Sequence, residues 1–299
     1  MKLYITYALI IFTACTTSRM SNQLSNYPVF LKEGHRGARG YVPENTIEAM
    51  KKGIDLGANV IEVDVYITKD GQVLIAHDPY VNRSISTIPG INEINADSAK
   101  SYTWHQMNYA EIRKIDVGIK GNPAFPRQVK QAAYMPLLGE LIDSIEAYTV
   151  SGKKPVIYNI EIKANPKFDG IYQPDAATIV RSVMEVVKSK NIGDRFYLQS
   201  FDRRQIQESH KSYPSVVTAY LVDSKTMSVD AHLQELGYTP EIYSPHYKLV
   251  TAQTVADCKK HNMRLVPWTV NTKNEIDSLV SMGVNGIITD YPDLVSGLK

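Results

Sequence analysis

The stretch Val60-Ile61-Glu62-Val63-Asp64-Val65-Tyr66-Ile67 alternates aliphatic residues with other residue types, which is the pattern of a β-strand. Successive side chains of a strand point to opposite faces, so Glu62 and Asp64 share one face and the aliphatic residues around them share the other. The aliphatic face can pack against a layer of helices. We therefore predict a strand that directs two carboxylates to the side where an active site can form.

The segment Tyr158-Asn159-Ile160-Glu161-Ile162-Lys163 repeats this pattern and places Asn159, Glu161 and Lys163 on one face. Three carboxylates, those of Glu62, Asp64 and Glu161, would then converge from neighbouring strands. Such a cluster is costly unless a cation binds it or some groups are protonated. Carboxylate oxygens suit Mg²⁺ or Ca²⁺ better than a thiolate-seeking metal. We predict one divalent cation here, either Mg²⁺ or Ca²⁺; for each strand alone, a solvated face or a salt bridge is the alternative.

Strand-like and helix-like segments alternate on both sides of these two strands, which indicates a parallel sheet covered by helices. The further strands are expected at Phe30–Gly34, Phe196–Gln199, Thr218–Val222, Ile242–Tyr243, Arg264–Val270 and Gly286–Ile288. Gln72–Ala76 is expected to be an accessory hairpin strand, which leaves eight strands. A (β/α)8 barrel needs about 250 residues. We therefore predict an α/β fold of the TIM (β/α)8 barrel class for residues 27–299.

Helical patterns fill the gaps between the strands, for example at Ala176–Lys188, Thr251–His261 and Lys273–Ser281 and after Pro136. The first helix is expected to begin at Asn45 or Thr46. Glu48 follows Asn45 by three residues, as in a capping box, and Gly57 is placed to end the helix.

Residues from about Asn82 to Ala133 interrupt this alternation and form an inserted segment after the second strand. A stretch of this length between barrel elements is usually a functional lid or a subdomain. Because it follows His77 and Asp78 directly, we expect it at the mouth of the pocket; decoration away from the site is the alternative.

The N-terminus has the features of an export segment. Lys2 is followed by an apolar run, Leu3 to Ala14, which is too short to span a bilayer but suits a signal peptide. The run ends in Phe12-Thr13-Ala14-Cys15, which resembles a bacterial lipobox. We expect residues 1–20 to be an export segment and tether, with Cys15 lipidated and the protein in the periplasm or cell envelope. Plain secretion with cleavage near Ala14 is the alternative.

The rest of the composition narrows the possible partners. The formal net charge is only +2, so nothing favours nucleic-acid binding, and membrane contact is expected only through the lipid anchor. With Cys15 lipidated, Cys258 would have no partner for a disulfide, and we expect it to be a small buried residue. The sequence does not indicate an oligomeric state.

Two of the seven histidines, His35 and His77, end predicted strands beside the carboxylates. Phosphodiester cleavage needs a base for the attacking hydroxyl and an acid for the leaving alcohol, and two histidines supply that pair near neutral pH. Arg36 and Lys163 can hold phosphate oxygens. His246 is a further candidate for the pocket, whereas we expect the remaining histidines on the surface or on helices, namely His105, His210, His232 and His261.

Short motifs occur in order along the chain: His35-Arg36-Gly37, Pro43-Glu44-Asn45-Thr46, Glu62-Val63-Asp64, His77-Asp78, Glu161-Ile162-Lys163, Gln199-Ser200-Phe201, Pro267-Trp268-Thr269-Val270-Asn271 and Thr289-Asp290-Tyr291-Pro292. Together they resemble the glycerophosphodiester phosphodiesterase family over about Phe30 to Asp293. Residues 82–133 lie where that family has an insertion.

The resemblance implies a TIM barrel that hydrolyses glycerophosphodiesters, its small-molecule substrates, to glycerol 3-phosphate and an alcohol. It implies Glu62, Asp64 and Glu161 as ligands of the cation, His35 and His77 as the acid/base pair, and Arg36 and Lys163 as phosphate contacts. It also implies that Glu44 and Asn45 support the pocket and that Gln199 and Trp268 line it. Trp268 shares strand parity with Val266 and Val270, which we expect to pack outward, so Trp268 should lie beyond the strand end; packing between the barrel and its helices is the alternative.

The expected mechanism is attack of the glycerol 2-hydroxyl on phosphorus, with a cyclic glycerophosphate that water then opens. Which histidine is the base and which alcohol is released stay open. Two other functions are compatible with the residues. One is a phospholipase C or D-like phosphodiesterase acting on intact lipid headgroups, and the other is a non-catalytic protein that binds glycerophosphodiesters.

Overall fold

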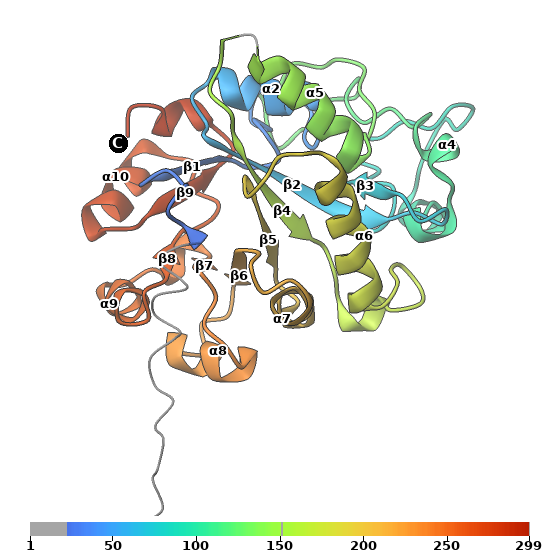
Figure 1. Cartoon of the computed structure of the whole chain (residues 1–299). Coiled ribbons are helices and arrows are strands. Elements are labelled where there is room, and N and C mark those ends of the chain that lie inside the picture. Colours follow the sequence, from blue (N-terminus) through green and yellow to red (C-terminus); the bar gives the residue numbers. More distant parts are fainter. Residues whose placement is uncertain (1–22, 151, 299) are drawn as a thin grey trace, which may run out of the picture.

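The computed structural model describes residues 23–150 and 152–298, within which eight parallel strands form the predicted barrel (Figure 1). Their order is β8-β7-β6-β5-β4-β2-β1-β9. The strands are β1 (Leu31–Gly34), β2 (Val60–Ile67), β4 (Ile157–Ile162), β5 (Phe196–Ser200), β6 (Thr218–Val222), β7 (Ile242–Pro245), β8 (Arg264–Leu265) and β9 (Gly286–Thr289). The short strand β3 (Val73–Ile75) pairs antiparallel with β2, as expected for an accessory hairpin.

Backbone hydrogen bonds close the barrel between β8 and β9. The Asn285 amide donates to the Leu265 carbonyl at 2.8 Å, and the Ile288 amide donates to the Pro267 carbonyl at 3.0 Å. The prediction of a strand over Arg264–Val270 was too long, because the regular strand ends at Leu265. Pro267 has no amide hydrogen to donate, so it interrupts the ladder although the extended chain continues past it.

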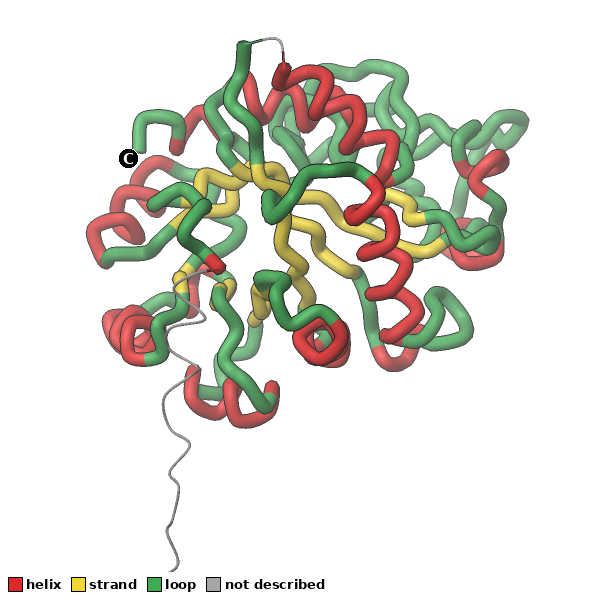
Figure 2. The backbone as a smooth tube through the Cα atoms, viewed as in Figure 1, coloured by secondary structure: helices red, strands yellow, loops and turns green. Residues whose placement is uncertain are grey.

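The helices form a ring around the strands, as Figures 1 and 2 show. The longer helices are α2 (Ile47–Asp55), α5 (Leu138–Val150), α6 (Ala176–Ser189), α7 (Arg203–Ser212), α8 (Val229–Leu236), α9 (Ala252–Lys260) and α10 (Lys273–Met282). Short 3-10 helices follow β4, β7 and β9 at Pro166–Phe168, Tyr247–Leu249 and Pro292–Val295. Cys258 is buried on α9, as expected. Among the described residues, no helix combines the length and the apolar composition needed to cross a membrane.

Thr46, not Asn45, is the N-cap of α2. The Thr46 side chain accepts a hydrogen bond from the Ala49 amide, and Gly57 follows the helix with a positive φ of 93°, as expected for a terminator. The prediction of a capping box between Asn45 and Glu48 was wrong, because the side-chain amide of Asn45 donates a hydrogen bond to Asp64 instead. Asn45 itself has φ 57°, a left-handed conformation that turns it toward the strands.

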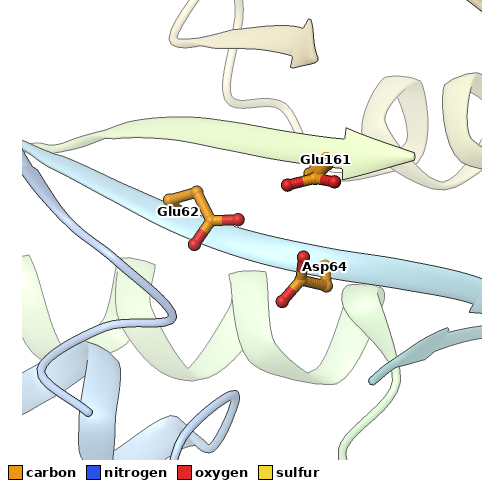
Figure 3. A group of neighbouring side chains, drawn as sticks. All are labelled: Glu62, Asp64 and Glu161. Atoms are coloured by element: carbon orange, nitrogen blue, oxygen red, sulfur yellow. The ribbon is translucent and has the colours of Figure 1, made fainter. Parts of the chain in front are cut away.

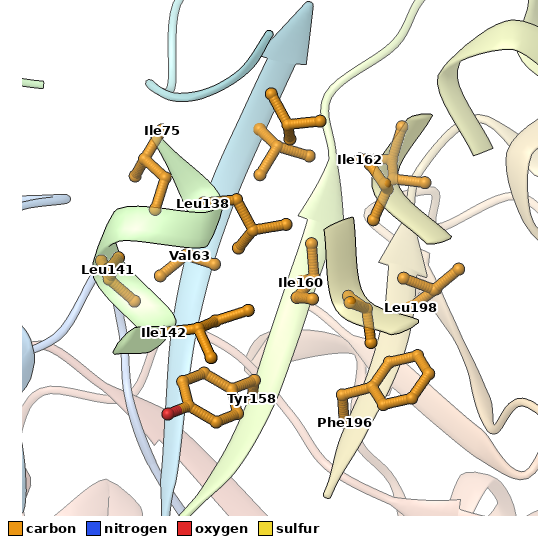
Figure 4. Packing of buried hydrophobic residues seen from close by; sticks show 14 of the residues in the cluster. Val63, Ile75, Leu138, Leu141, Ile142, Tyr158, Ile160, Ile162, Phe196 and Leu198 are labelled. Carbon is orange, nitrogen blue, oxygen red and sulfur yellow. The ribbon is translucent and has the colours of Figure 1, made fainter. Parts of the chain in front are cut away.

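The outward faces of the strands pack against the helices in a core of aliphatic side chains. Figure 4 shows Val63 on β2 beside Leu138 and Ile142 of α5, and the same cluster continues through Ile160 on β4 to Leu198 on β5. Val63 and Ile160 are fully buried and are partners in register across β2 and β4. The aliphatic half of each strand is thereby used for packing, and the other half faces the barrel interior.

The barrel interior is apolar at one end and polar above it. Leu31, Val60, Ile157 and Ile242, near the beginnings of their strands, form a cluster with Val266. The expectation that Val266 packs outward was therefore wrong. Higher in the barrel, the buried Glu33 carboxylate accepts hydrogen bonds from the Tyr197 hydroxyl at 2.5 Å and from the Asn159 amide at 2.9 Å.

Residues 82–133 contain only short helices, α3 (Ala96–Ser101), α4 (Tyr109–Ile112) and a 3-10 turn at Trp104–Gln106. They pack against β2 and β3 through a separate apolar cluster that includes Tyr66, Leu74, Trp104 and Ile112. The indole nitrogen of Trp104, a residue only 2% exposed, donates to the Asp78 carbonyl at 2.6 Å. The inserted segment is thus joined to the loop that carries His77.

Candidate active site

The loop after β1 brings His35 and Arg36 to the carboxyl end of the barrel. The His35 amide donates to the Thr289 carbonyl at 2.9 Å, which joins the ends of β1 and β9. Arg36 has φ 49° and Gly37 has φ 85°. A Cβ atom on Gly37 would lie 2.4 Å from the backbone of Ala49, so only glycine lets this loop pass so close to α2.

The three carboxylates converge as expected. Glu62 and Asp64 on β2 face Glu161 on β4 (Figure 3), and candidate ligand oxygens of the three residues all lie within 4.8 Å of one another. Asp64 and Glu161 are partners in register across the two strands. All three side chains are buried, so solvent does little to screen their charges.

Neighbouring groups fix these carboxylates but leave part of them free. Glu62 accepts the Arg36 amide at 2.6 Å, and Asp64 accepts the Asn45 side-chain amide at 2.8 Å. The other oxygens, Oε1 of Glu62 and Oδ1 of Asp64, are buried without a hydrogen-bond partner among the described residues. Buried acceptors without donors are rare, so these two oxygens and the nearby Glu161 suit a divalent cation with oxygen ligands.

The charges within the cluster are strongly perturbed. Burial and the charges of Asp64 and Glu161 raise the pKa of Glu62 well above its usual range. Burial likewise raises the pKa of Glu161, although Lys163 opposes this shift. Burial also acts to raise the pKa of Asp64, but the charges of Arg36 and Lys163 outweigh it and hold that pKa below its usual value. The cluster therefore carries unfavourable charge that a bound cation would neutralise.

Two cationic side chains flank the carboxylates. The Lys163 ammonium lies 2.7 Å from Oε1 of Glu161 and 3.7 Å from Oδ1 of Asp64. The Arg36 guanidinium donates from Nη1 to Glu44 at 2.6 Å, and its Nε lies 3.2 Å from Asp64. Both cations are thus held at the edge of the cluster, where a phosphate group could reach them.

The two histidines have different surroundings. His35 is buried, and its Nδ1 lies 2.7 Å from Oδ1 of Asp290. Burial and the charge of Arg39 lower the pKa of His35 to about 4, against the opposing effect of Asp290. His77 is about one-third exposed, and its Nδ1 lies 3.0 Å from Oδ1 of Asp78. Neutral His35 can therefore act as a proton acceptor at neutral pH.

A cavity of about 150 Å³ connects these groups. Its charged and titratable lining is His35, Arg36, Arg39, His77, Glu161 and Lys163, and the rest of the wall includes Gln199, Phe201 and Trp268. The ring of Trp268 lies edge-on to Phe201 at 5.2 Å, and its indole nitrogen donates to the Ser244 carbonyl at 2.9 Å. Trp268 thus lies beyond the end of β8, as expected, and faces the cavity with the parity of the interior Val266. Val270, which has the same parity, packs in the outer cluster with Ile276 of α10, as expected.

The remaining candidates are placed as follows. Glu44 and Asn45 hold Arg36 and Asp64, which puts them behind the cavity. His246 is not among the lining residues of this cavity and instead stacks edge-on against Trp268 at 5.3 Å. His232 is on α8 as expected but is buried, where it is bonded to the Tyr243 hydroxyl. Cys15 lies outside the described residues.

Sequence reasoning missed Arg39, Asp290 and Phe201 as parts of the site. Arg39 lines the cavity and donates from Nε to Asp290 at 2.6 Å. Asp290 and Phe201 both belong to motifs identified in the sequence, but neither residue was predicted to have a role in the site. The available signal for Asp290 was its position directly after a predicted strand, where the functional side chains of a barrel are found.

Comparisons with known proteins agree with this geometry. Residues 35–294 match the profile of the Glycerophosphoryl diester phosphodiesterase family. The chain is 29% identical over 274 residues to a glycerophosphodiester phosphodiesterase of Bacillus subtilis, covering 90% of this chain and 86% of that protein. It is 30% identical over 268 residues to one of Caldanaerobacter subterraneus subsp. tengcongensis, covering 88% and 95%.

Solved structures share the fold. A Silicibacter pomeroyi protein given the same family name superposes with a TM-score of 0.79 at 27% identity, covering 92% of this chain and 95% of that one. An Oleispira antarctica phosphodiesterase, in complex with the product sn-glycerol-3-phosphate, superposes with a TM-score of 0.71 at 21% identity, covering 91% and 96%.

Proposed function

We propose, for a chain that belongs to the glycerophosphoryl diester phosphodiesterase family and is a phosphoric diester hydrolase, a reaction assisted by one divalent cation. This reaction would split glycerophosphodiesters into glycerol 3-phosphate and an alcohol. The observation that carries this proposal is the cluster of Glu62, Asp64 and Glu161 beside two histidines and two cationic side chains. The product complex of the Oleispira phosphodiesterase supports glycerol 3-phosphate as the product.

The carboxylate cluster is the proposed cation site. The unpaired oxygens of Glu62 and Asp64 fit a hard divalent cation, and both Mg²⁺ and Ca²⁺ take such ligands. When bound, the cation would supply Lewis-acid stabilisation of the charge on the phosphate. Arg36 and Lys163 would contact the phosphate oxygens from the edge of the cluster, and Gln199 and Trp268 would line the space for the rest of the substrate.

His35 and His77 are the proposed acid/base pair, since both line the same cavity. In the first step, one histidine takes the proton of the glycerol 2-hydroxyl as that oxygen bonds to phosphorus. The other histidine gives a proton to the alcohol oxygen whose bond to phosphorus breaks. Water then opens the cyclic glycerophosphate with the roles reversed. Phosphorus NMR under single-turnover conditions tests this route: without any cyclic intermediate, direct attack by water is the better explanation.

The test of the activity is release of glycerol 3-phosphate from glycerophosphocholine and glycerophosphoethanolamine by the purified protein. The assay is run with EDTA and then with Mg²⁺ or Ca²⁺ restored. Glu62→Gln should abolish the release, whereas Glu241→Gln should retain it. Glu241 is a suitable control because it is also a buried carboxylate but precedes β7 and so lies at the opposite end of the barrel. No release with any cation or headgroup would refute the proposal.

The position of the N-terminal segment favours soluble substrates over intact lipids. Tyr27 packs with Val60, Ile157 and Ile242 at the beginnings of β2, β4 and β7, which is the end of the barrel opposite the site. Arg264 holds this segment by donating to the Pro28 carbonyl at 2.6 Å. An anchor at Cys15 could extend at most about 28 Å from Gln23. It would therefore attach the protein by the end remote from the cavity.

We accordingly propose an exported protein that Cys15 anchors to the membrane and that acts on deacylated diesters. Cell fractionation of the wild type and of Cys15→Ala tests the anchor. The wild type should sediment with membranes, and the variant should not. Parallel assays with intact phosphatidylcholine test the lipid alternative, and release of its headgroup at a rate matching that of the deacylated diester would favour the phospholipase function instead.

A further inference from the structure

The carboxylate of Asp290 contacts three side chains, two from the loop after β1 and one from the segment after β8. Its Oδ1 lies 2.7 Å from Nδ1 of His35 and accepts Nε of Arg39 at 2.6 Å. Its Oδ2 accepts Nη2 of Arg39 at 3.3 Å and the side-chain amide of Asn271 at 2.6 Å. Asp290 is only 1% exposed, so these groups, and not water, satisfy its oxygens.

Asn271 fixes Asp290 at two points. Besides donating to the carboxylate, its side-chain oxygen accepts the Asp290 backbone amide at 3.0 Å and the Thr289 hydroxyl at 3.2 Å. Arg39 is itself held, because its guanidinium stacks on Phe125 at 4.7 Å and its backbone carbonyl accepts the Gln128 side-chain amide at 2.8 Å. The orientation of Asp290 is thus set before a substrate arrives.

This arrangement determines which nitrogen of His35 is protonated. Burial acts to raise the pKa of Asp290, but contacts with His35 and Arg39 outweigh it and hold that pKa below its usual value. Asp290 therefore stays ionised and can only accept a hydrogen bond. A neutral His35 must then carry its proton on Nδ1, which leaves the lone pair on Nε2 for the reaction.

We propose that Asp290, held by Arg39 and Asn271, is a positioning residue that fixes His35 as the Nδ1-protonated tautomer and so makes its Nε2 the base of the first step. His77 is then the acid of that step. Its own carboxylate partner, Asp78, is about one-third exposed and holds it less firmly. The inference rests on the proposed function for the identity of the reaction, but the tautomer of His35 can be observed without turnover.

The experiment records two-bond proton–nitrogen correlation spectra of the ¹⁵N-labelled protein at pH 7, with the His35 signals identified by their loss in His35→Gln. We expect a protonated Nδ1 and an unprotonated Nε2 in the wild type and in the control Glu241→Gln. In Asp290→Asn, the new amide can donate to Nδ1, and the proton should move to Nε2. An Nε2-protonated or doubly protonated His35 in the wild type would overturn the inference.

Kinetics supply the second readout. Asp290→Asn should lower kcat on the order of 10⁴-fold, the scale of loss when the carboxylate that orients a histidine base is replaced by its amide, while KM should change by less than about threefold. Asn271→Leu keeps the charge of the site and the shape of the side chain, and it should lower kcat by about tenfold with His35 still protonated on Nδ1. Because Asn271→Leu leaves Asp290 in place, its kcat still tests the positioning role if Asp290→Asn fails to fold.

The outcomes separate the two proposals. An inactive wild type with the expected tautomer would refute the proposed function and leave the orientation of His35 intact. An active wild type would refute the positioning role alone if Asp290→Asn keeps both kcat and the tautomer, or if Asn271→Leu keeps kcat at the wild-type value.

Discussion

Arg36 donates a hydrogen bond of 2.6 Å from Nη1 to Oε1 of Glu44, and the side chains are only 10% and 8% exposed. In the proposed contact of Arg36 with the phosphate, Glu44 would therefore act through Arg36 and would not need to touch the substrate. Although burial acts to raise the pKa of Glu44, the charges of Arg36 and Arg39 lower it, so Glu44 remains a carboxylate at neutral pH. Asn122, from the inserted segment, lies 3.4 Å from the other oxygen of Glu44.

Replacing Glu44 with Gln should therefore weaken substrate binding. The neutral amide would no longer pair with the guanidinium, and Arg36 would turn further toward Asp64. We expect KM to rise by about tenfold and the free energy of unfolding to fall by about 1–3 kcal/mol, because a buried charged group loses its partner. Steady-state kinetics and urea denaturation measure the two effects. Glu48→Gln, four residues along on the exposed side of α2, is the control; equal values in both variants would contradict the role of the pair.

A divalent cation should stabilise the folded protein through the carboxylate cluster. A ligand that binds only the folded state at 100 times its dissociation constant adds about 2.7 kcal/mol to the free energy of unfolding. Glu62→Gln should lose this gain, and in EDTA it should be at least as stable as the wild type because one of three converging charges is gone. Thermal unfolding with Mg²⁺ and with Ca²⁺ measures the gain, and Glu241→Gln should retain it. A gain that survives in Glu62→Gln would place the cation elsewhere.

Strand parity is the part of this fold and site that the sequence determines most directly. The alternation around Glu62 and Asp64 involves neighbouring residues of one strand only, so it predicts the face on which the two carboxylates lie without any information on tertiary contacts. Register then brought Glu161 alongside, because neighbouring parallel strands of a barrel place functional side chains at the same end.

Val266 shows where this reasoning fails. The interior of the barrel is apolar at the end opposite the site, where the strands begin. An aliphatic residue there can therefore face either the interior or the helices. Hydrophobicity alone therefore does not distinguish the inward face of β8 from its outward face. The strand is also short, because Pro267 interrupts it, so few alternating residues are left to indicate the face. Asp290 was missed for a different reason: it lies 255 residues from His35 and approaches it only because β9 pairs with β1.

The buried Glu33 should make the stability of the protein fall as pH rises. Burial raises its pKa from 4.5 to about 7, although the hydrogen bonds from Tyr197 and Asn159 oppose the shift. The folded state therefore binds a proton that the unfolded chain releases between pH 4.5 and 7. Over that window the contribution of Glu33 to stability should decline by at most about 3 kcal/mol.

Glu33→Gln isolates this contribution because glutamine does not titrate. We expect the free energy of unfolding of the variant, minus that of the wild type, to increase from pH 4.5 to 7.5. Urea denaturation in EDTA at several pH values gives this difference, and the other titrating groups largely cancel in it. A difference that is constant over the range would mean that folding does not raise the pKa of Glu33.

Trp104 should link the inserted segment to catalysis through its hydrogen bond to the Asp78 carbonyl. Trp104→Phe keeps an aromatic ring in the apolar cluster but leaves that carbonyl without its donor, which should cost about 1–3 kcal/mol of stability. Because Asp78 contacts Nδ1 of His77, the freed loop should also hold His77 less well, and we expect kcat to fall by about tenfold.

Tyr148→Phe loses a hydrogen bond to Asp55 on the outside of the barrel and is the control, with kcat expected to remain at the wild-type value. Unfolding and steady-state assays on both variants decide the matter: a loss of stability in Trp104→Phe with an unchanged kcat would reduce the inserted segment to a structural role.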